Sequence, residues 1–478
     1  MKRTKNTYIY IVTISGLYFL MVILLHSRLQ VEICQTQTEY KKAEIHIHSV
    51  SNENISSVHV IFKSPLLVNV KKNFVFNKSV PCHLPDDSRN FTFQTVADNF
   101  FFVYTAYLDA RMNITFVRIM SILLKGKADK VIVVCTFRSY GAEDFFVHAK
   151  KYEMCENHNK KYGGWIMSCP LPEKFLEPCQ VEVSIIHKTN PLFRSNNVTL
   201  NLIKLSPSSA KHNYGVCVPP LFGSVNHSRL IEFMEFTQYF GAEKFIFYDH
   251  EIKDVKSLKA LEYYTNKTIA TIIPWKLPND ILDTEIWYHG QLIAHNDCLY
   301  RSMSLVDKLA IQDIDELIVP HDGSIFWDQS ITPLFKNSVV GLGIHSAFFD
   351  TAFSGVVLAI SSIRRTKVFS RLRTKVLVKP SAIFEVGIHH VSKPLFEEYK
   401  IISPSTKTVV LHHYRRCLSN YGMNCKDWVL DETIKNKYGH IEHNIVEVNA
   451  IITKLELSTS IPDDNAQVVA VSQNKIFL

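Results

Sequence analysis

The pattern of hydrophobic and polar positions changes near residue 205. Before that point, apolar and polar residues alternate in runs of strand length, most clearly at 58–62, 130–137, 180–186 and 198–203. A period of two is typical of a strand with one buried face, and runs at hairpin-scale spacing are typical of a β-sandwich. We therefore predict a β-rich module over residues 56–205.

After a linker at residues 206–210, short apolar strands alternate with helices. Apolar residues recur at helical spacing in 230–240 and 290–301, and Gly241 ends the first of these helices. Strands are predicted at 216–220, 244–249, 268–275, 339–344 and 375–380. The alternation indicates an α/β layer with a mostly parallel sheet over residues 211–435. Residues 436–478 are expected to be a C-terminal segment and tail.

The first residues predict a membrane anchor. Residues 8–25 carry no charge and are long enough to cross a bilayer as a helix. Lys2, Arg3 and Lys5 precede this helix, which favours a cytoplasmic tail at 1–7. A cleaved signal peptide is the alternative, but its apolar region would be shorter and would end in a small-residue cleavage site. We expect a type II protein with a stem at 26–55 and the rest in the lumen or outside.

Composition is consistent with that compartment and excludes one class of partner. The 478 residues suggest two or three domains, and a net charge of +8 without a dense Lys/Arg run argues against nucleic acid. The ten cysteines include no C-x-x-C pair, which argues against a zinc site and favours disulfides of unknown pairing. N-glycosylation sequons occur at Asn54, Asn77, Asn90, Asn113, Asn197, Asn226 and Asn266.

Residues 311–320 carry the candidate chemistry. Asp313, Asp315 and Glu316 lie between two apolar runs. In extended backbone the two aspartates point to the same side, while Ile314 points into the core. Two oxygen ligands suit Mg²⁺ or Mn²⁺, which could neutralise a diphosphate leaving group; the alternative is an acidic turn. Asp249 ends another strand, and ligands of open parallel sheets bind at such ends, which favours the metal site.

Other motifs narrow the chemistry further. The pair His412–His413 ends an apolar run beside Arg415 and Arg416, so a ligand or phosphate role competes with a structural one. The chain has no G-x-G-x-x-G after a strand, no Walker loop, no G-x-S-x-G and no H-E-x-x-H. Dinucleotide oxidoreductases, P-loop NTPases, serine hydrolases and zinc proteases are therefore disfavoured.

Several ordered motifs resemble glycosyltransferase family 92, which was earlier described as a domain of unknown function. They are VCVPPLFG (216–223), LIEFMEFTQYFGAEKFIFYD (230–249), GQLIAHNDCLYR (290–301), DIDELIVP (313–320) and HHYRRC (412–417). The segments at 107–111 and 161–165 also resemble the family's upstream region. Residues 345–355 match the family more loosely, which leaves acceptor specificity open.

The resemblance implies a fold, a reaction and a location. It implies a GT-A-type catalytic domain in a type II Golgi membrane protein that adds β1,4-linked galactose from UDP-galactose, with inversion and with Mn²⁺ or another divalent cation. The acceptor would be a glycan on a glycoprotein or glycolipid, and the protein could form a homodimer. The implied metal ligands are Asp313, Asp315 and His413, with His412 as an alternative to the last.

The remaining site residues follow from the same resemblance and from the expected displacement at the anomeric carbon. Asp249 would lie near the nucleoside, Asn296 and Asp297 would line the donor pocket, and Arg415 or Arg416 would stabilise the departing UDP. The base that takes the acceptor proton is predicted to be Asp350, with Glu316 as its competitor and as a support for the metal acids. Two other functions stay open at this point: a non-catalytic carbohydrate-binding membrane glycoprotein and a lumenal glycosidase.

Overall fold

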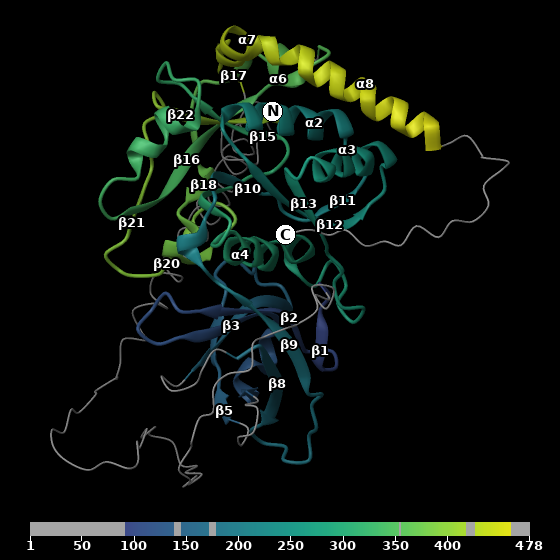
Figure 1. Ribbon diagram of the computed structural model, residues 1–478, viewed down its shortest axis with the longest axis vertical. Coiled ribbons are helices and arrows are strands. Elements are labelled where there is room, and N and C mark those ends of the chain that lie inside the picture. The colour runs from purple at the N-terminus through teal and green to yellow at the C-terminus, as the bar shows by residue number, and fades with distance from the viewer. Residues whose placement is uncertain (1–90, 138–144, 172–177, 353–354, 417–425, 460–478) are drawn as a thin grey trace, which may run out of the picture.

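The structure is a computed structural model that describes residues 91–137, 145–171, 178–352, 355–416 and 426–459 (Figure 1). The predicted cytoplasmic tail, anchor and stem, and the strand predicted at 58–62, lie outside these residues. Among the helices that the structure describes, none is both long and apolar enough to span a bilayer.

The N-terminal part is a β-sandwich built from one continuous sheet. Its nine strands run in the order β5-β4-β8-β9-β2-β3-β7-β6, with β1 on β2. The disulfide Cys135–Cys169 joins β4 to β7, which are far apart in this order, so the sheet folds back and its two halves face each other. Apolar side chains from both halves form one core between them. The strands are β1 (Gln94–Ala97), β2 (Phe101–Asp109), β3 (Phe116–Leu124), β4 (Val131–Phe137), β5 (Phe145–His148), β6 (Lys150–Glu153), β7 (Tyr162–Pro170), β8 (Gln180–His187) and β9 (Val198–Lys204).

The second part is an α/β layer around a twelve-stranded sheet. The first strands of this sheet are parallel, with β12 and β14 on either side of β10 and β13 beyond β12. The later strands β18, β16, β22 and β15 mix both directions, since β18 runs antiparallel to β14 and to β16, and β22 runs parallel to β16. The sheet is therefore mixed, and the prediction of a mostly parallel sheet holds for its first half only.

Most of the strands and helices predicted from the sequence for this second part are present in the structure. Its strands are β10 (His212–Cys217), β11 (Leu221–Gly223), β12 (Lys244–Ile252), β13 (Ala270–Pro274), β14 (Val306–Ile311), β15 (Glu316–Pro320), β16 (Val339–Phe349), β17 (Arg364–Thr366), β18 (Ser370–Val378), β21 (Lys400–Ile402), β22 (Val409–Tyr414) and β23 (Trp428–Leu430), with β19 (Ile383–Val386) and β20 (Val391–Pro394) in a separate hairpin. Its helices are α2 (His227–Phe240), α3 (Val255–Asn266), α4 (Gln291–Ser302), α5 (Trp327–Ser330), α6 (Leu358–Ser361), α7 (Thr433–Tyr438) and α8 (Glu442–Thr459).

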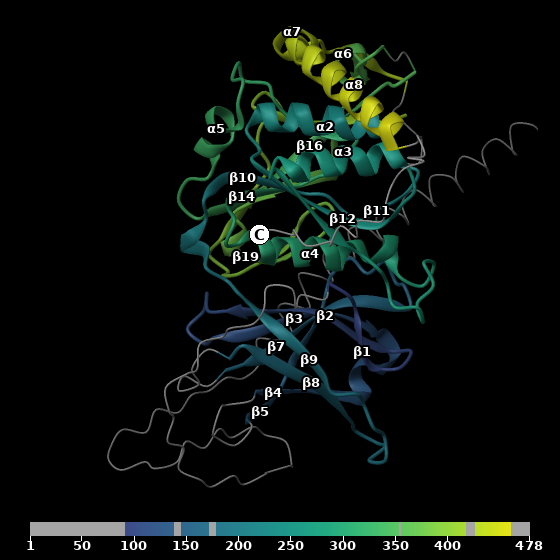
Figure 2. The same cartoon turned by 45° about the vertical axis from the view of Figure 1, so that its right-hand side comes forward.

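The central strands are buried on both faces. In β12, Phe245 and Phe247 pack with α2, α3 and α8, whereas Ile246 and Tyr248 pack with α4 and the β-sandwich. Figures 1 and 2 show the resulting layers, with α2, α3 and α8 above the sheet and α4 between the sheet and the sandwich. Capping residues explain the bounds of α2. The Asn226 side chain accepts the Arg229 N–H at the start of the helix, and Gly241 ends the helix with a φ of 124°.

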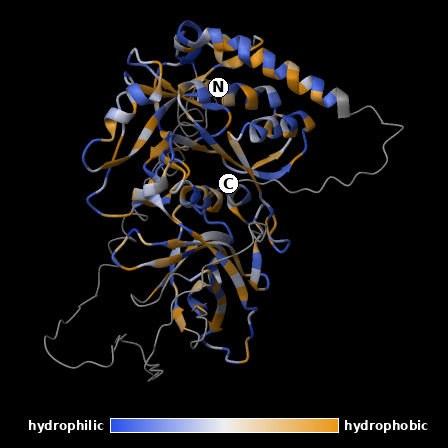
Figure 3. Cartoon of the chain, in the orientation of Figure 1, coloured by the Kyte–Doolittle hydropathy of each residue, from blue (hydrophilic) through white to orange (hydrophobic). Residues whose placement is uncertain are grey.

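The α/β layer extends past the predicted boundary at residue 435. Helix α8 packs on α2 and α3, and Ile445, Val448 and Ile452 are buried in the same core as those helices. Figure 3 shows hydrophobic and hydrophilic residues alternating along α8, as expected for a helix with one buried face. The described part of the C-terminal segment is thus a structural element of the layer.

Candidate active site

The acidic residues form a turn at the edge of the sheet. Asp313 and Asp315 lie between β14 and β15, and the Glu316 N–H donates to the Asp313 carbonyl at 3.1 Å. The backbone is therefore turned here and not extended as predicted, although Ile314 does pack against the core. The prediction of an acidic pair after a buried strand is confirmed, and the geometry of the pair is that of a turn.

A buried lysine holds the first aspartate. Lys375 comes from β18, its side chain is 1% exposed, and its Nζ lies 2.8 Å from Asp313 Oδ2 and 3.5 Å from Glu316 Oε2. Burial would raise the pKa of Asp313, but the ammonium group outweighs it and lowers that pKa to about 2. Burial would likewise lower the pKa of Lys375, but the two carboxylates raise it above its usual value. Asp313 and Lys375 are thus both charged at neutral pH.

Glu316 is enclosed behind the turn. Its side chain is 2% exposed, and its carboxylate accepts the Asp313 N–H at 3.1 Å. Burial raises the pKa of Glu316 to about 7; Lys375 opposes this shift and Asp313 adds to it. A carboxyl group enclosed by Lys375, His413 and the turn cannot reach an acceptor hydroxyl. The expectation that Glu316 competes for the role of catalytic base is therefore corrected, and its contacts make it a positioning residue for Asp313.

His413 faces the acids from the opposite side. It lies on β22 across from Glu316 in the antiparallel ladder, with Nε2 at 3.4 Å from Asp315 Oδ2 and Nδ1 at 3.4 Å from a Glu316 oxygen. Its ring stacks on Phe348, and neither nitrogen makes a hydrogen bond to the described residues. Burial would lower the pKa of His413, but the neighbouring carboxylates raise it.

The choice between the two neighbouring histidines is settled by the alternation along β22. His412 points away from the acids, and its Nε2 lies 2.8 Å from His321 Nε2 while its Nδ1 lies 3.2 Å from the Tyr414 hydroxyl. Burial holds the pKa of His412 well below its usual value. His413 is therefore the histidine of the acidic turn.

The turn and Asp249 share one edge of the sheet. Cys217 lies opposite Ile246 in β12 and opposite Ile311 in β14, so the residues that follow these positions leave the sheet on the same side. Asp249 lies near the end of β12, where its Oδ1 accepts the Ile252 N–H at 3.0 Å. The structure thus places Asp249 at the predicted edge, two strands from Asp313.

Asp350 and Arg415 also lie at this edge, beyond β22. The Tyr414 N–H donates to the Asp315 carbonyl at 2.8 Å, and Tyr414 lies opposite Phe349. Asp350 directly follows Phe349, so one strand separates it from the turn. Its Oδ1 accepts the Ala352 N–H at 3.1 Å. Arg415 follows Tyr414 and is exposed.

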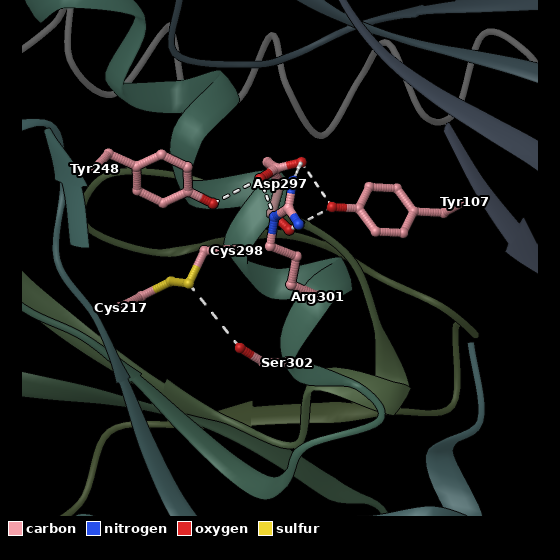
Figure 4. The surroundings of a disulfide bond; sticks show 7 residues. All are labelled: Tyr107, Cys217, Tyr248, Asp297, Cys298, Arg301 and Ser302. Atoms are coloured by element: carbon pink, nitrogen blue, oxygen red, sulfur yellow. Dashed lines mark hydrogen bonds and ion pairs between the residues drawn. A yellow bond between two sulfur atoms is a disulfide. The ribbon is translucent and has the colours of Figure 1, made fainter. Parts of the chain in front are cut away.

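Asn296 and Asp297 are buried in α4 and do not line a pocket. Both are fully buried. The Asp297 carboxylate accepts hydrogen bonds from Thr105, Tyr107, Tyr248 and Arg301 at 2.6–2.7 Å. Figure 4 shows Tyr107, Tyr248 and Arg301 around Asp297, beside the disulfide Cys217–Cys298, which joins β10 to α4. The expectation that Asp297 lines the donor pocket is corrected, because its oxygens accept hydrogen bonds from side chains of the sandwich, of the sheet and of its own helix.

Asn296 has the same kind of role on the other side of α4. Its side-chain amide donates to the Val386 carbonyl at 2.9 Å and accepts the Val386 N–H at 3.0 Å. It also donates to the Leu292 carbonyl at 2.8 Å. These bonds fix β19 against α4. Because they occupy the Asn296 amide, the prediction that Asn296 lines the donor pocket is corrected.

The sequence model of glycosyltransferase family 92 matches residues 212–451, about half of the chain. This span contains the acidic turn, Lys375 and His413. The chain belongs to glycosyltransferase family 92.

Two relatives of this family 92 member are β-1,4-galactosyltransferases by name. The chain is 27% identical over 341 residues to the Caenorhabditis elegans beta-1,4-galactosyltransferase galt-1, covering 70% of this chain and 78% of that protein. It is 23% identical over 239 residues to the Arabidopsis thaliana galactan beta-1,4-galactosyltransferase GALS1, covering 48% and 46%. The β-sandwich strands lie outside the family match.

Solved structures resemble the family 92 chain only distantly. Glucosyl-3-phosphoglycerate synthase from Mycobacterium tuberculosis, in complex with Mn²⁺, UDP-glucose and phosphoglyceric acid, aligns with a TM-score of 0.26 at 11% identity, covering 53% of this chain and 82% of that one. The mannosyltransferase PcManGT from Pyrobaculum calidifontis, in complex with GDP-Man and Mn²⁺, aligns with a TM-score of 0.26 at 12% identity, covering 54% and 79%.

Three residues of the site were missed from the sequence. Lys375 lies in a fully buried stretch of β18, and a lysine in an apolar run is a signal that it has a buried acidic partner. Arg229 is near the turn, since its guanidinium donates to the Tyr414 carbonyl at 3.4 Å and the Tyr414 N–H donates to the Asp315 carbonyl. Tyr288 is also near, since its pKa is raised by burial and then by Asp313 and Asp315. No local pattern marks Arg229 or Tyr288.

Proposed function

We propose that this chain transfers a hexose, galactose from UDP-galactose, onto a glycan of a glycoprotein or glycolipid, with inversion at the anomeric carbon and with a divalent cation. The observation that carries the proposal is the acidic turn with Lys375 and His413, at the carboxyl ends of parallel strands. Ligands of open α/β sheets bind at such ends. The transferred sugar and the linkage are supported by the names of the two galactosyltransferase relatives.

The residues present fit a divalent cation in part. Asp315 and His413 offer an oxygen and a nitrogen 3.4 Å apart, and the His413 nitrogens are buried without a hydrogen bond to the described residues. Two ligands of one ion at about 2.1 Å lie roughly 3.0–3.4 Å apart. Asp313, in contrast, is paired with Lys375. Among the described residues, Asp313, Asp315 and His413 do not form a group whose ligand atoms all lie within 4.8 Å of one another.

Asp315 and His413 would therefore hold the cation, and Asp313 would join them only where it leaves Lys375. A bound cation supplies Lewis-acid stabilisation of the diphosphate. The chain's own cations surround the same place: Lys375 is buried beside Asp313, and Arg229 and Arg415 lie nearby. These charges favour an anionic diphosphate at the turn and stabilise UDP as it departs.

Asp350 is the proposed base. The acceptor hydroxyl oxygen forms a bond to the anomeric carbon while the bond from that carbon to the UDP oxygen breaks, and the hydroxyl proton passes to the Asp350 carboxylate. Asp350 suits this role because it is partly exposed at the same edge, with β22 between it and the turn. Displacement from the face opposite UDP inverts the configuration.

The anchor, the Golgi location and the lumenal orientation are part of the same proposal. Disulfides persist in oxidising compartments, and Cys135–Cys169 and Cys217–Cys298 are both formed. The four sequon asparagines in the described ranges, Asn113, Asn197, Asn226 and Asn266, are all exposed. The membrane anchor and the homodimer stay predictions.

The test is sugar transfer by the purified full-length chain. UDP-sugars are screened against galactose-ended glycans with Mn²⁺ and with a chelator, and the Asp315→Asn and Asp350→Asn variants are compared with the wild type. Asp315→Asn should lower kcat/KM by roughly 100-fold or more, and Asp350→Asn by about 10²–10⁴-fold. Asp322→Asn is the matched control, because Asp322 is exposed and its carboxylate accepts the N–H of Ser324 in its own loop.

Each outcome bears on a different part of the proposal. Transfer that persists in chelator, or an Asp315→Asn variant of full activity, would overturn the metal site. A full-activity Asp350→Asn variant would reassign the base. Glycan binding without turnover of any UDP-sugar, equal in the wild type and Asp315→Asn, would favour the non-catalytic carbohydrate-binding protein.

A further inference from the structure

We propose that His250, Asp283 and His289 form a Zn²⁺ site beside the acidic turn. The proposal does not depend on sugar transfer. One ligand atom from each side chain lies within 4.8 Å of the others. The absence of C-x-x-C pairs excludes only a cysteine-based site, and two imidazoles with one carboxylate are a known zinc ligand set that leaves a position open for water.

The distances among the three side chains are close to those of a tetrahedral ion. His289 Nδ1 lies 3.2 Å and His250 Nε2 lies 3.9 Å from Asp283 Oδ1. Ligand atoms at about 2.1 Å from a tetrahedral ion lie about 3.4 Å from one another. The first distance matches this value, and the second requires a shift of about half an ångström by Asp283, which is 61% exposed and therefore free to move.

One tryptophan orients the His250 imidazole and holds the backbone of His289. His250 Nδ1 donates to the Trp275 carbonyl at 2.9 Å, so Nε2 carries the lone pair that faces Asp283. The Trp275 indole N–H donates to the His289 carbonyl at 2.8 Å and fixes the backbone of the second ligand. A carbonyl partner such as that of Trp275, which sets the tautomer and the ring orientation of His250, is typical of metal-binding histidines.

His289 combines a buried ring nitrogen with an uncommon backbone conformation. Its Nδ1 is buried and makes no hydrogen bond to the described residues. Its backbone is left-handed, with φ of 55°, and follows Tyr288 with φ of 41°. Two successive left-handed residues with side chains are strained, and such strain persists only where contacts hold it. A bound ion would coordinate the His289 Nδ1 and stabilise the left-handed backbone at residues 288–289.

Two imidazoles, against the single His413 of the acidic turn, distinguish this site from that of the turn. Mg²⁺ and Mn²⁺ prefer oxygen, whereas imidazole suits Zn²⁺. The site also lies at the same edge of the sheet as the turn, because His250 follows Asp249, which lies two strands from Asp313. The ion would fix the segment before α4, with Tyr288 in it, at this edge of the sheet.

The other histidine–aspartate group in the described residues does not show the same need for an ion. His321 and His412 are hydrogen-bonded to each other at 2.8 Å. Asp431 accepts bonds from Arg365 at 2.7 Å and from the Thr433 N–H at 3.1 Å. Its polar atoms are already paired, so only the His250 group is proposed as a metal site.

The test measures bound metal in the purified full-length chain, carrying a tag without histidine. The protein is dialysed against Zn²⁺ and assayed for zinc content, and Co²⁺ is used as a second probe because tetrahedral Co²⁺ has strong visible absorption. The His250→Ala/His289→Ala variant should lose one equivalent of zinc and the tetrahedral Co²⁺ bands. The matched control is His212→Ala, since His212 pairs with Glu243 at 2.7 Å but is not part of any such group of three in the described residues.

Two further variants keep the test decisive. Asp283→Asn changes an exposed side chain and so should leave the fold intact while weakening zinc binding by at least ~10-fold. Asp315→Asn should retain the Co²⁺ bands, which assigns them to the His250 site and not to the acidic turn. Zinc content and Co²⁺ bands that are equal in the wild type, the double variant and Asp283→Asn would overturn the proposal, whatever the chain does with UDP-sugars.

Discussion

Replacing Lys375 by methionine tests whether the charges of the acidic turn depend on one buried ammonium group. The substitution keeps the length of the side chain and removes its charge, which leaves Asp313 and Glu316 facing each other without the ammonium group between them. We expect the variant to be less stable than the wild type at pH 7.5. We also expect the loss to be smaller at pH 5.5.

The magnitude follows from the burial of the group. Breaking a buried ion pair by removing one partner costs about 3–5 kcal/mol. The lowering of the Asp313 pKa from 3.8 to about 2 corresponds by itself to about 2 kcal/mol. The Asp313 side chain is 33% exposed, so water screens part of this interaction. We therefore expect a loss near the lower end of the range, about 3 kcal/mol at pH 7.5.

The pH dependence follows from Glu316. Its pKa is raised to about 7 in the folded protein, against about 4.3 in an unfolded chain, so the folded state binds the extra proton between these values. Stability from this group is therefore fully present below pH 4.3 and is lost as pH rises through 7. Lys375 lowers the pKa of Glu316, so its removal raises that pKa further and increases the penalty at pH 7.5 more than at pH 5.5.

The assay is urea unfolding at both pH values and constant ionic strength, with Lys308→Met as the matched control. Lys308 is also a buried lysine of this sheet, with Nζ 2.6 Å from Asp307 Oδ2, but Asp307 is 53% exposed and can be solvated when the lysine is removed. The control should lose no more than about 1 kcal/mol. A Lys375→Met loss no larger than that of the control, or one that is equal at both pH values, would refute the reasoning.

Two further predictions concern α4 and its contacts with the sandwich. Asp297→Asn should cost about 3 kcal/mol in urea unfolding, because it leaves Arg301 buried without its carboxylate; equal stability to the wild type would contradict this. Gly164→Ala should cost about 1–3 kcal/mol, because the added Cβ would lie 2.8 Å from Ile293 of α4, while Gly126→Ala, with nothing within 4 Å, should change stability little. Equal unfolding midpoints for the two glycine variants would contradict the second prediction.

The parts of the fold that could be predicted are those set by local physics. Helix α2 was found because its apolar spacing is helical and because glycine, free to adopt a positive φ, ends it at Gly241. The alternation of strands and helices gave the α/β layer, but not the direction of its later strands. The direction of a strand depends on the strands with which it pairs, and β18 pairs antiparallel with β14 and with β16. The pattern of apolar residues within β18 does not indicate this direction.

The candidate site could be predicted only where its residues are adjacent in sequence. Asp313 and Asp315 share one motif, whereas Lys375 lies 62 residues away and reaches Asp313 through the pairing of β14 with β18. His413 was found because it ends an apolar run, and the choice over His412 follows from the register of β22 against β15. Asn296 and Asp297 were misassigned because a polar residue on a helix looks the same whether it faces a ligand or a buried network.

That buried network changes how the β-sandwich should be understood. Tyr107 of the sandwich donates to Asp297 across 190 residues of sequence, and Tyr248 of the twelve-stranded sheet donates to the same carboxylate. Apolar side chains of β2, β3, α4 and β14 form one core around it. A carboxylate that needs donors from both parts cannot stay satisfied if they separate, and burying it unpaired is costly. The sandwich therefore supports the strands that carry the acidic turn and folds with them as one unit.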